Sequence, residues 1–146
     1  MAKIITQEEA EKLLKIEKIK VDNKEWALPF GGNKISVPLQ SKDKKEKFML
    51  DANTSRFCLK KLTLQNRTRD TIILCRLDLG ITHRNPNGEE IGSPHLHIYK
   101  EGFDDKWAYP LPEGIFQDVD NRWKLLCDFM KYCNIVEKPN FKRGLF

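Results

Sequence analysis

Three polar residues, His95, His97 and Tyr99, occupy alternate positions in a segment that otherwise has the composition of a buried strand. Side chains alternate between the two faces of a strand, so these three share one face while Leu96 and Ile98 share the other. Imidazole titrates near neutral pH, and a pair of imidazoles can therefore serve as general base and general acid in one reaction. The spacing predicts a polar row with the capacity for acid–base chemistry.

The preceding strand-like segment, Ile73 to Leu79, offers charged partners for this row, because Arg76 and Asp78 fall on its polar face. The polar faces converge if the two segments lie in one sheet. Cleavage of RNA without metal needs a base for the 2′-hydroxyl, a cation for the phosphate and an acid for the leaving oxygen. We therefore predict His95, His97 and Arg76 as catalytic residues of a metal-independent endoribonuclease that needs no cofactor.

Two other interpretations fit the same residues. A His-x-His pair on a strand is commonly solvated polar surface. His95, His97 and Asp78 also have the two-histidine, one-carboxylate composition of a metal site, whose existence depends on geometry.

The charge of the chain favours an anionic partner. Lys and Arg number 26 against 21 Asp and Glu, which gives a net charge of +5. Such an excess attracts nucleic acid, although it also serves solubility alone. We expect phosphate contacts from cations near the polar row and in the charged turns, and base stacking from one tyrosine. The predicted nucleic-acid-binding residues are Lys44, Lys61, Arg67, Arg69, Arg84, Tyr99 and Lys100.

Two resemblances add to this interpretation. From about Phe48 onward the chain is similar to a family of small uncharacterised proteins of bacteria and their prophages. The shared residues are His-Arg-Asn-Pro-Asn-Gly-Glu at 83–89, Pro-His-Leu-His-Ile-Tyr at 94–99 and Glu-Gly-Phe-Asp-Asp-Lys-Trp-Ala at 101–108. That resemblance carries no activity.

A shorter stretch, Ile35 to Lys42, resembles the strand and loop of ToxN-type endoribonuclease toxins from type III toxin–antitoxin systems, with Gln40 where those have threonine. This resemblance implies that Ser41 and Lys42 lie at a cleavage site and that an RNA antitoxin is the partner. A non-enzymatic protein of a phage or other mobile element, which binds a host nucleoprotein or a nucleotide signal, is the alternative function.

These residues must be positioned by helices and strands, and the sequence predicts one helix before the strands and one after them. Thr6 and Glu9 form a capping box, which predicts a helix that runs to near Ile19. A second helix is predicted from a cap at Asp118 or Asp120 through Tyr132.

Between the helices, segments with strand composition are separated by short turns. Trp26 to Phe30 and Lys34 to Leu39 flank Gly31-Gly32-Asn33, which predicts a hairpin. Short connections favour antiparallel pairing. We predict a single α+β domain over residues 1–146, with a curved antiparallel sheet of about five to seven strands on which an N-terminal and a C-terminal helix pack.

Composition also indicates the cellular compartment and the state of the cysteines. No apolar run approaches the ~20 residues of a membrane helix, and no export signal is evident, so we expect a cytoplasmic protein. The four cysteines form no Cys-x-x-Cys pair and are interpreted as small buried apolar residues.

Overall fold

The structure is a computed structural model, and it describes residues 4–142. These residues contain two helices, α1 at Gln7–Lys15 and α2 at Arg122–Tyr132. The strands of the largest sheet are β1 (Lys18–Lys20), β3 (Lys34–Ser41), β4 (Lys47–Thr54), β5 (Leu62–Thr68), β6 (Ile72–Leu79), β9 (His95–Ile98), β10 (Ala108–Pro110) and β11 (Ile135–Glu137). Two smaller pairs join β2 (Glu25–Ala27) to β12 (Asn140–Lys142) and β7 (His83–Arg84) to β8 (Glu90–Ile91). The predicted α+β class is confirmed.

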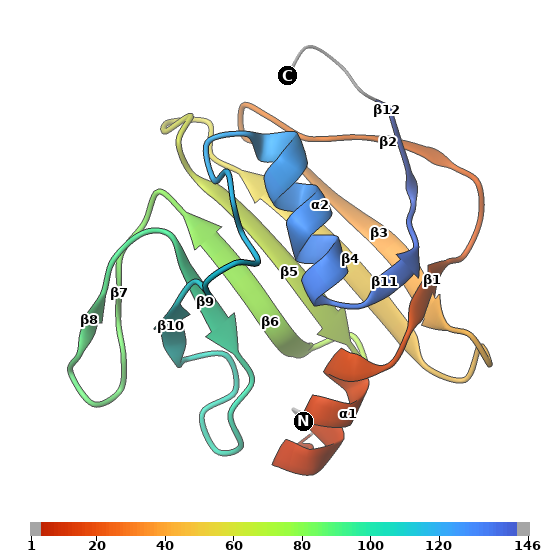
Figure 1. Cartoon of the computed structure of the whole chain (residues 1–146), viewed down its shortest axis with the longest axis horizontal. Coiled ribbons are helices and arrows are strands. Elements are labelled where there is room, and N and C mark those ends of the chain that lie inside the picture. Colours follow the sequence, from red (N-terminus) through yellow and green to blue (C-terminus); the bar gives the residue numbers. More distant parts are fainter. Residues whose placement is uncertain (1–3, 143–146) are drawn as a thin grey trace.

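The large sheet is open and mostly antiparallel (Figure 1). Its strand order is β10-β9-β6-β5-β4-β3-β1-β11, and the β1–β11 pair at one edge is parallel. Four strands from β3 to β6 follow one another through short connections, as the turn-rich sequence predicts. The sheet exceeds the predicted five to seven strands because the tail, which lacks a clear periodicity, adds β11 at the edge.

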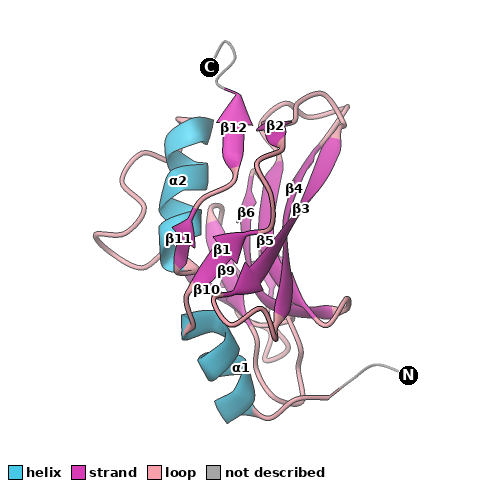
Figure 2. Cartoon of the chain, turned by 90° about the vertical axis from the view of Figure 1, so that its right-hand side faces the viewer, coloured by secondary structure: helices cyan, strands magenta, loops and turns pink. Residues whose placement is uncertain are grey.

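One face of the sheet is apolar and lies against α2 (Figure 2). A continuous row of buried side chains crosses four paired strands on this face: Ala52, Leu64, Leu77 and Leu96. Helix α2 buries Leu125, Leu126, Phe129 and Met130 in the same core. Because side chains alternate along each strand, the residues next to this row point to the opposite face, on which Figure 2 shows no helix among residues 4–142.

The helix ends follow local hydrogen bonding. The Thr6 hydroxyl accepts from the Glu9 amide at 3.1 Å, so the predicted cap of α1 is confirmed. The helix stops earlier than predicted, because Ile16 is already extended at ψ 149° and leads into β1. The cap of α2 is Asn121, whose side chain accepts from Lys124, so the predicted caps Asp118 and Asp120 are wrong.

The predicted hairpin around residues 31–33 is also wrong. Strand β2 pairs in parallel with β12, near the other end of the chain, and β3 pairs instead with β4 and β1. The Gly31-Gly32 turn is present, with positive φ angles at both glycines, but it changes the direction of the chain without pairing its flanks.

Candidate functional site

Two members of the predicted polar row, His95 and His97, lie on the face opposite α2, whereas Tyr99 belongs to the core. Strand pairing places Arg76 beside His97, and Asp78 beside His95. On the other side of β6, Gln65 pairs with Arg76 and Thr63 with Asp78. The polar faces of β5, β6 and β9 therefore converge, as the alternation in the sequence predicts.

Three potential ligand atoms meet at the centre of this row. The Nε2 atoms of His95 and His97 lie 3.1 Å apart. The Asp78 Oδ2 atom lies 3.2 Å from the first and 3.0 Å from the second. The three atoms thus form a nearly equilateral triangle.

The outer nitrogens of both imidazoles face backbone carbonyls. His95 Nδ1 lies 3.1 Å from the Gly92 oxygen, and His97 Nδ1 lies 2.7 Å from the Asp105 oxygen. A carbonyl oxygen only accepts, so each Nδ1 carries the proton in these hydrogen bonds. In a neutral imidazole the lone pair then resides on Nε2, and both lone pairs point into the triangle.

Arg76 closes one side of the triangle. Its guanidinium donates to His97 Nε2 from Nη2 at 3.0 Å and to Asp78 Oδ2 from Nε at 3.3 Å. Its Nη1 atom donates to the Asp105 carboxylate at 2.5 Å. His95 Nε2 has no such donor among residues 4–142, since its polar neighbours there are His97 Nε2 and the Asp78 carboxylate. A cation between these atoms, whether a proton or a metal ion, is needed to offset their repulsion.

The two histidines are enclosed, although they lie on the face without a helix. Both are 0 % exposed. The third histidine, His83, covers them from the β7–β8 hairpin, with its ring centroid 4.6 Å from that of His97. Its Nε2 atom donates to the Lys106 carbonyl at 2.7 Å. Loops thus shield the imidazoles from one side.

The open edge of the cluster is a shallow hollow of about 330 Å³. Its lining residues are Asn53, Lys61, Thr63, Gln65, Arg76, Asp78, Leu79 and Ile81. Asp78 belongs both to the triangle and to the hollow. Through Asp78, the cluster therefore borders the hollow.

The environment sets the protonation of the cluster. Burial alone would raise the pKa of Asp78, but its contact with His97 and the charge of Arg76 outweigh burial and hold this pKa at about 2. Burial lowers the pKa of His95 below its ordinary value, and the Gly92 and Asp78 contacts oppose that shift only partly. A neutral His95 beside an ionised Asp78 is the state that ligates a metal ion.

The spacing of the triangle fits one metal ion. Two atoms that each lie ~2.0–2.1 Å from one ion are roughly 2.9 Å apart at a right angle and roughly 3.4 Å apart at a tetrahedral angle. The observed separations, 3.0 to 3.2 Å, fall between these limits. The Nδ1–H···O=C hydrogen bonds are the usual means by which proteins orient metal-binding imidazoles.

The structure does not bring Ser41 and Lys42 to this cluster. Both lie at the end of β3, three strands from β6 in the sheet order. The pairing register also places Ser41 near the Thr68 end of the sheet, opposite the end at which Asp78 lies. The Ser41 side chain is buried and donates to Asp43 at 2.6 Å, and Lys42 pairs with Glu17.

The three arginines among the predicted phosphate contacts already have carboxylate partners. Arg67 binds Asp51 through two nitrogens, and Arg69 pairs with Glu9 and Glu46. Arg84 pairs with Glu90 within the β7–β8 hairpin. These ion pairs neutralise the three arginines where they lie, so a phosphate group would have to compete with the carboxylates for them.

Of the other residues predicted to bind nucleic acid, Tyr99 lies in the core and the three lysines lie nearer the surface. Tyr99 is 4 % exposed and its hydroxyl donates to the Ile5 carbonyl, so it cannot stack on a base as predicted. Lys100 lies 4.3 Å from the centre of the Trp107 ring. Lys44 is exposed in a turn at φ 64°, and Lys61 is exposed at the rim of the hollow.

Sequence reasoning missed Asp105 and the two backbone carbonyls that orient the histidines. Asp105 lies in the loop after β9, where no periodicity points to a contact with β6. The available signal was the Asp104-Asp105 pair, which follows the histidines within ten residues of the sequence.

Comparison with known proteins shows the family. The chain belongs to a family described as of unknown function (DUF6978), which matches residues 5–135. No curated protein and no solved structure matches the chain. No helix among residues 4–142 is long and apolar enough to cross a membrane.

Proposed function

We propose that this protein binds one divalent transition-metal ion, Zn²⁺ or Fe²⁺, on Asp78, His95 and His97. The supporting observation is the triangle of donor atoms at 3.0 to 3.2 Å, with both Nδ1 atoms tied to carbonyls. Two imidazoles and one carboxylate suit ions of this class better than Mg²⁺ or Ca²⁺, which prefer oxygen ligands. A metal site on these residues replaces the metal-free mechanism expected from the sequence.

Three protein ligands leave a coordination position for water, and this is the arrangement of hydrolytic rather than purely structural sites. An ion held by Asp78, His95 and His97 would supply a Lewis acid that lowers the pKa of a bound water, as Zn²⁺ does to roughly 7 in hydrolytic sites. Lys61 and Arg76 at the hollow attract an anionic group toward that position. We therefore propose hydrolysis of a phosphate ester as the reaction class.

Metal affinity tests the proposal. We expect Zn²⁺ to be withdrawn from a chromophoric chelator by the wild-type protein, and affinity to fall about a hundredfold or more in His97→Ala and Asp78→Asn. His83→Ala is the matched control, because that imidazole is adjacent but donates to Lys106 and lies outside the triangle. Equal Zn²⁺ affinity in all four proteins would refute the assignment.

Metal-independent RNA cleavage by the same cluster is the second candidate. It is favoured by the 3.0 Å contact between Arg76 and His97, which joins a phosphate-binding cation to an acid–base group. The resemblance to ToxN-type toxins would add an RNA antitoxin as partner, although Ser41 and Lys42 lie away from the cluster. RNA cleavage that persists in a chelator, and that is lost in a His95→Ala, His97→Ala variant, would favour this candidate over the metal centre.

A further inference from the structure

The loop between β4 and β5, residues 55–61, exposes apolar and cationic side chains together. Phe57 is 93 % exposed and Leu59 is 73 % exposed. The three cations of the loop are also exposed, and they form no ion pair with any residue from 4 to 142: Arg56, Lys60 and Lys61. The loop thus differs from the arginines at 67, 69, 76 and 84, each of which has a carboxylate partner.

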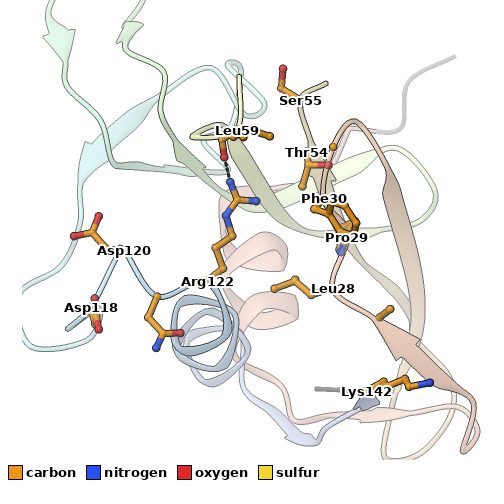
Figure 3. A pocket seen from close by; sticks show the side chains of 13 residues that line it. Leu28, Pro29, Phe30, Thr54, Ser55, Leu59, Asp118, Asp120, Arg122 and Lys142 are labelled. Atoms are coloured by element: carbon orange, nitrogen blue, oxygen red, sulfur yellow. Dashed lines mark hydrogen bonds between the residues drawn. The ribbon is translucent and has the colours of Figure 1, made fainter. Parts of the chain in front are cut away.

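A cavity of about 890 Å³ lies beside this loop (Figure 3). One wall is apolar and is formed by Leu28, Pro29 and Phe30, with Leu59 facing them from the β4–β5 loop. Phe30 is 73 % exposed, so an aromatic face is available at the rim.

The other wall of the cavity is polar. It is formed by the start of α2 and the residues before it: Asp118, Asp120, Asn121 and Arg122. Arg122 donates to the Leu59 carbonyl, which fixes the β4–β5 loop to the helix (Figure 3). The combination of an apolar wall with hydrogen-bonding groups opposite suits a planar ligand that has polar edges.

We propose that this surface binds single-stranded nucleic acid, with bases on Phe57, on Phe30 and in the cavity, and with phosphates along Arg56, Lys60 and Lys61. Exposed aromatic side chains interleaved with cations are the recurrent means of binding single strands. The two aromatic residues belong to neighbouring loops, because Gly32 lies directly against Arg56. Lys61 also borders the hollow that contains Asp78. A nucleic acid bound along this surface would therefore extend toward the Asp78, His95 and His97 cluster.

An anionic membrane surface is the competing partner for exposed aromatic residues and cations. The cavity argues against it. Asp118 and Asp120 line the cavity with Arg122, and a lipid layer would have to desolvate these charges. A nucleobase can instead hydrogen-bond to them. The proposal does not depend on the metal centre, since none of the residues in the proposed surface is a ligand.

Fluorescence anisotropy with a labelled oligouridylate of about ten nucleotides tests the proposal, with a chelator present so that the metal centre plays no part. We expect Phe57→Ala to weaken binding about tenfold. The double variant Arg56→Glu, Lys60→Glu should weaken it further and reduce the slope of log affinity against log salt by about 1.4, at roughly 0.7 per phosphate contact. Lys12→Glu with Lys15→Glu is the matched control, because it makes the same change in net charge at exposed positions of α1, outside the proposed surface.

An equal loss of affinity in the Lys12, Lys15 control would overturn the proposal, because net charge alone would then explain binding. The absence of wild-type binding at low salt would overturn it too. Binding to phosphatidylglycerol vesicles that is lost in Phe57→Ala, without oligonucleotide binding, would assign the surface to membranes. A parallel titration with oligodeoxythymidylate separates RNA from DNA, and tighter binding of either strand supports the proposal.

Discussion

At the scale of single residues, Arg76 bears on whether the histidine cluster binds a metal ion or cleaves RNA without one. Its guanidinium lies 3.0 Å from His97 Nε2 and 3.3 Å from Asp78 Oδ2, so it competes with a metal ion for the same atoms. Guanidinium does not lose its proton in proteins, and only displacement removes its charge. The Asp105 carboxylate, already bound to Nη1, is positioned to retain the displaced side chain.

We therefore predict that Arg76→Gln raises Zn²⁺ affinity by about tenfold, or ~1.4 kcal/mol. The removal of a positive charge beside the ligands favours a cation among them. Competition with a chromophoric chelator measures the change, and Arg84→Gln, in the hairpin, is the control. A metal-free ribonuclease would show instead no gain in affinity and a loss of RNA cleavage.

Lys18 is the other residue whose charge is enclosed. It is 0 % exposed, and its ammonium donates to the carbonyls of Leu14, Ile16 and Cys133 at 2.8 to 3.2 Å. Burial lowers its pKa from 10.5 to about 8, so it remains protonated at pH 7. The side chain thereby joins the end of α1 to the end of α2.

Replacement of Lys18 by Met leaves three carbonyls without their donor. We expect the free energy of unfolding to fall by ~2–5 kcal/mol in urea denaturation. Lys20→Met is the matched control on the same strand, because its Nζ reaches only Asn140 at an exposed position. A change below ~1 kcal/mol in Lys18→Met would show that the three contacts contribute little.

At the scale of elements, cross-strand pairs hold the polar face of the sheet. Asp51 on β4 accepts from Arg67 and Gln65 on β5 at 2.7 to 3.0 Å. Burial alone would raise the pKa of Asp51, but these hydrogen bonds outweigh it and hold the pKa below 3.8. A carboxyl group whose pKa is depressed by folding contributes stability above its unfolded pKa and loses it as pH falls through the folded value.

We predict that Asp51→Asn is less stable than wild type at pH 7 and that the difference shrinks as pH falls below about 4. Urea denaturation across that range measures it, with the exposed Glu113→Gln as the control. Asp78 retains its own acid-dependent contribution in both proteins. A difference that does not depend on pH would contradict this account of the Asp51–Arg67 pair.

The strands also show which parts of the fold could be predicted from the sequence. The β6 and β9 strands and their polar row follow from alternation, because period-two patterning survives in any antiparallel pairing. A strand near β2 was predicted, but its pairing was not, since its partner, β12, is more than 100 residues away and only tertiary packing brings the two together. The ion pairs that neutralise Arg67 and Arg69 also join residues that are not sequence neighbours, 16 and 60 positions apart, so a count of cations overstated the basic surface.

At the scale of the whole molecule, the loops that enclose the cluster come from separate parts of the chain. His83, Gly92 and Asp105 each contact a ring of the pair from outside β9. A metal ion on Asp78, His95 and His97 would bridge β6 and β9 beneath these loops. Such an ion stabilises the folded state by mass action, because the unfolded chain does not hold the three ligands in place.

Thermal unfolding checks this consequence. With free Zn²⁺ at about 100 times its dissociation constant, stabilisation should approach ~2.7 kcal/mol, and the transition temperature should rise. The rise should be absent in His95→Ala and retained in His83→Ala. An equal rise in both variants would place the binding of Zn²⁺ elsewhere on the surface.

Metal content of the purified protein tests the metal centre most directly. We expect elemental analysis to find close to one Zn or Fe ion per chain after exhaustive dialysis. An Asp78→Asn, His95→Gln, His97→Gln variant, which keeps side-chain volume while it removes the donor set, should contain almost none. A wild-type protein without metal that also fails to take up Zn²⁺ or Fe²⁺, or a triple variant that retains it, would contradict the account.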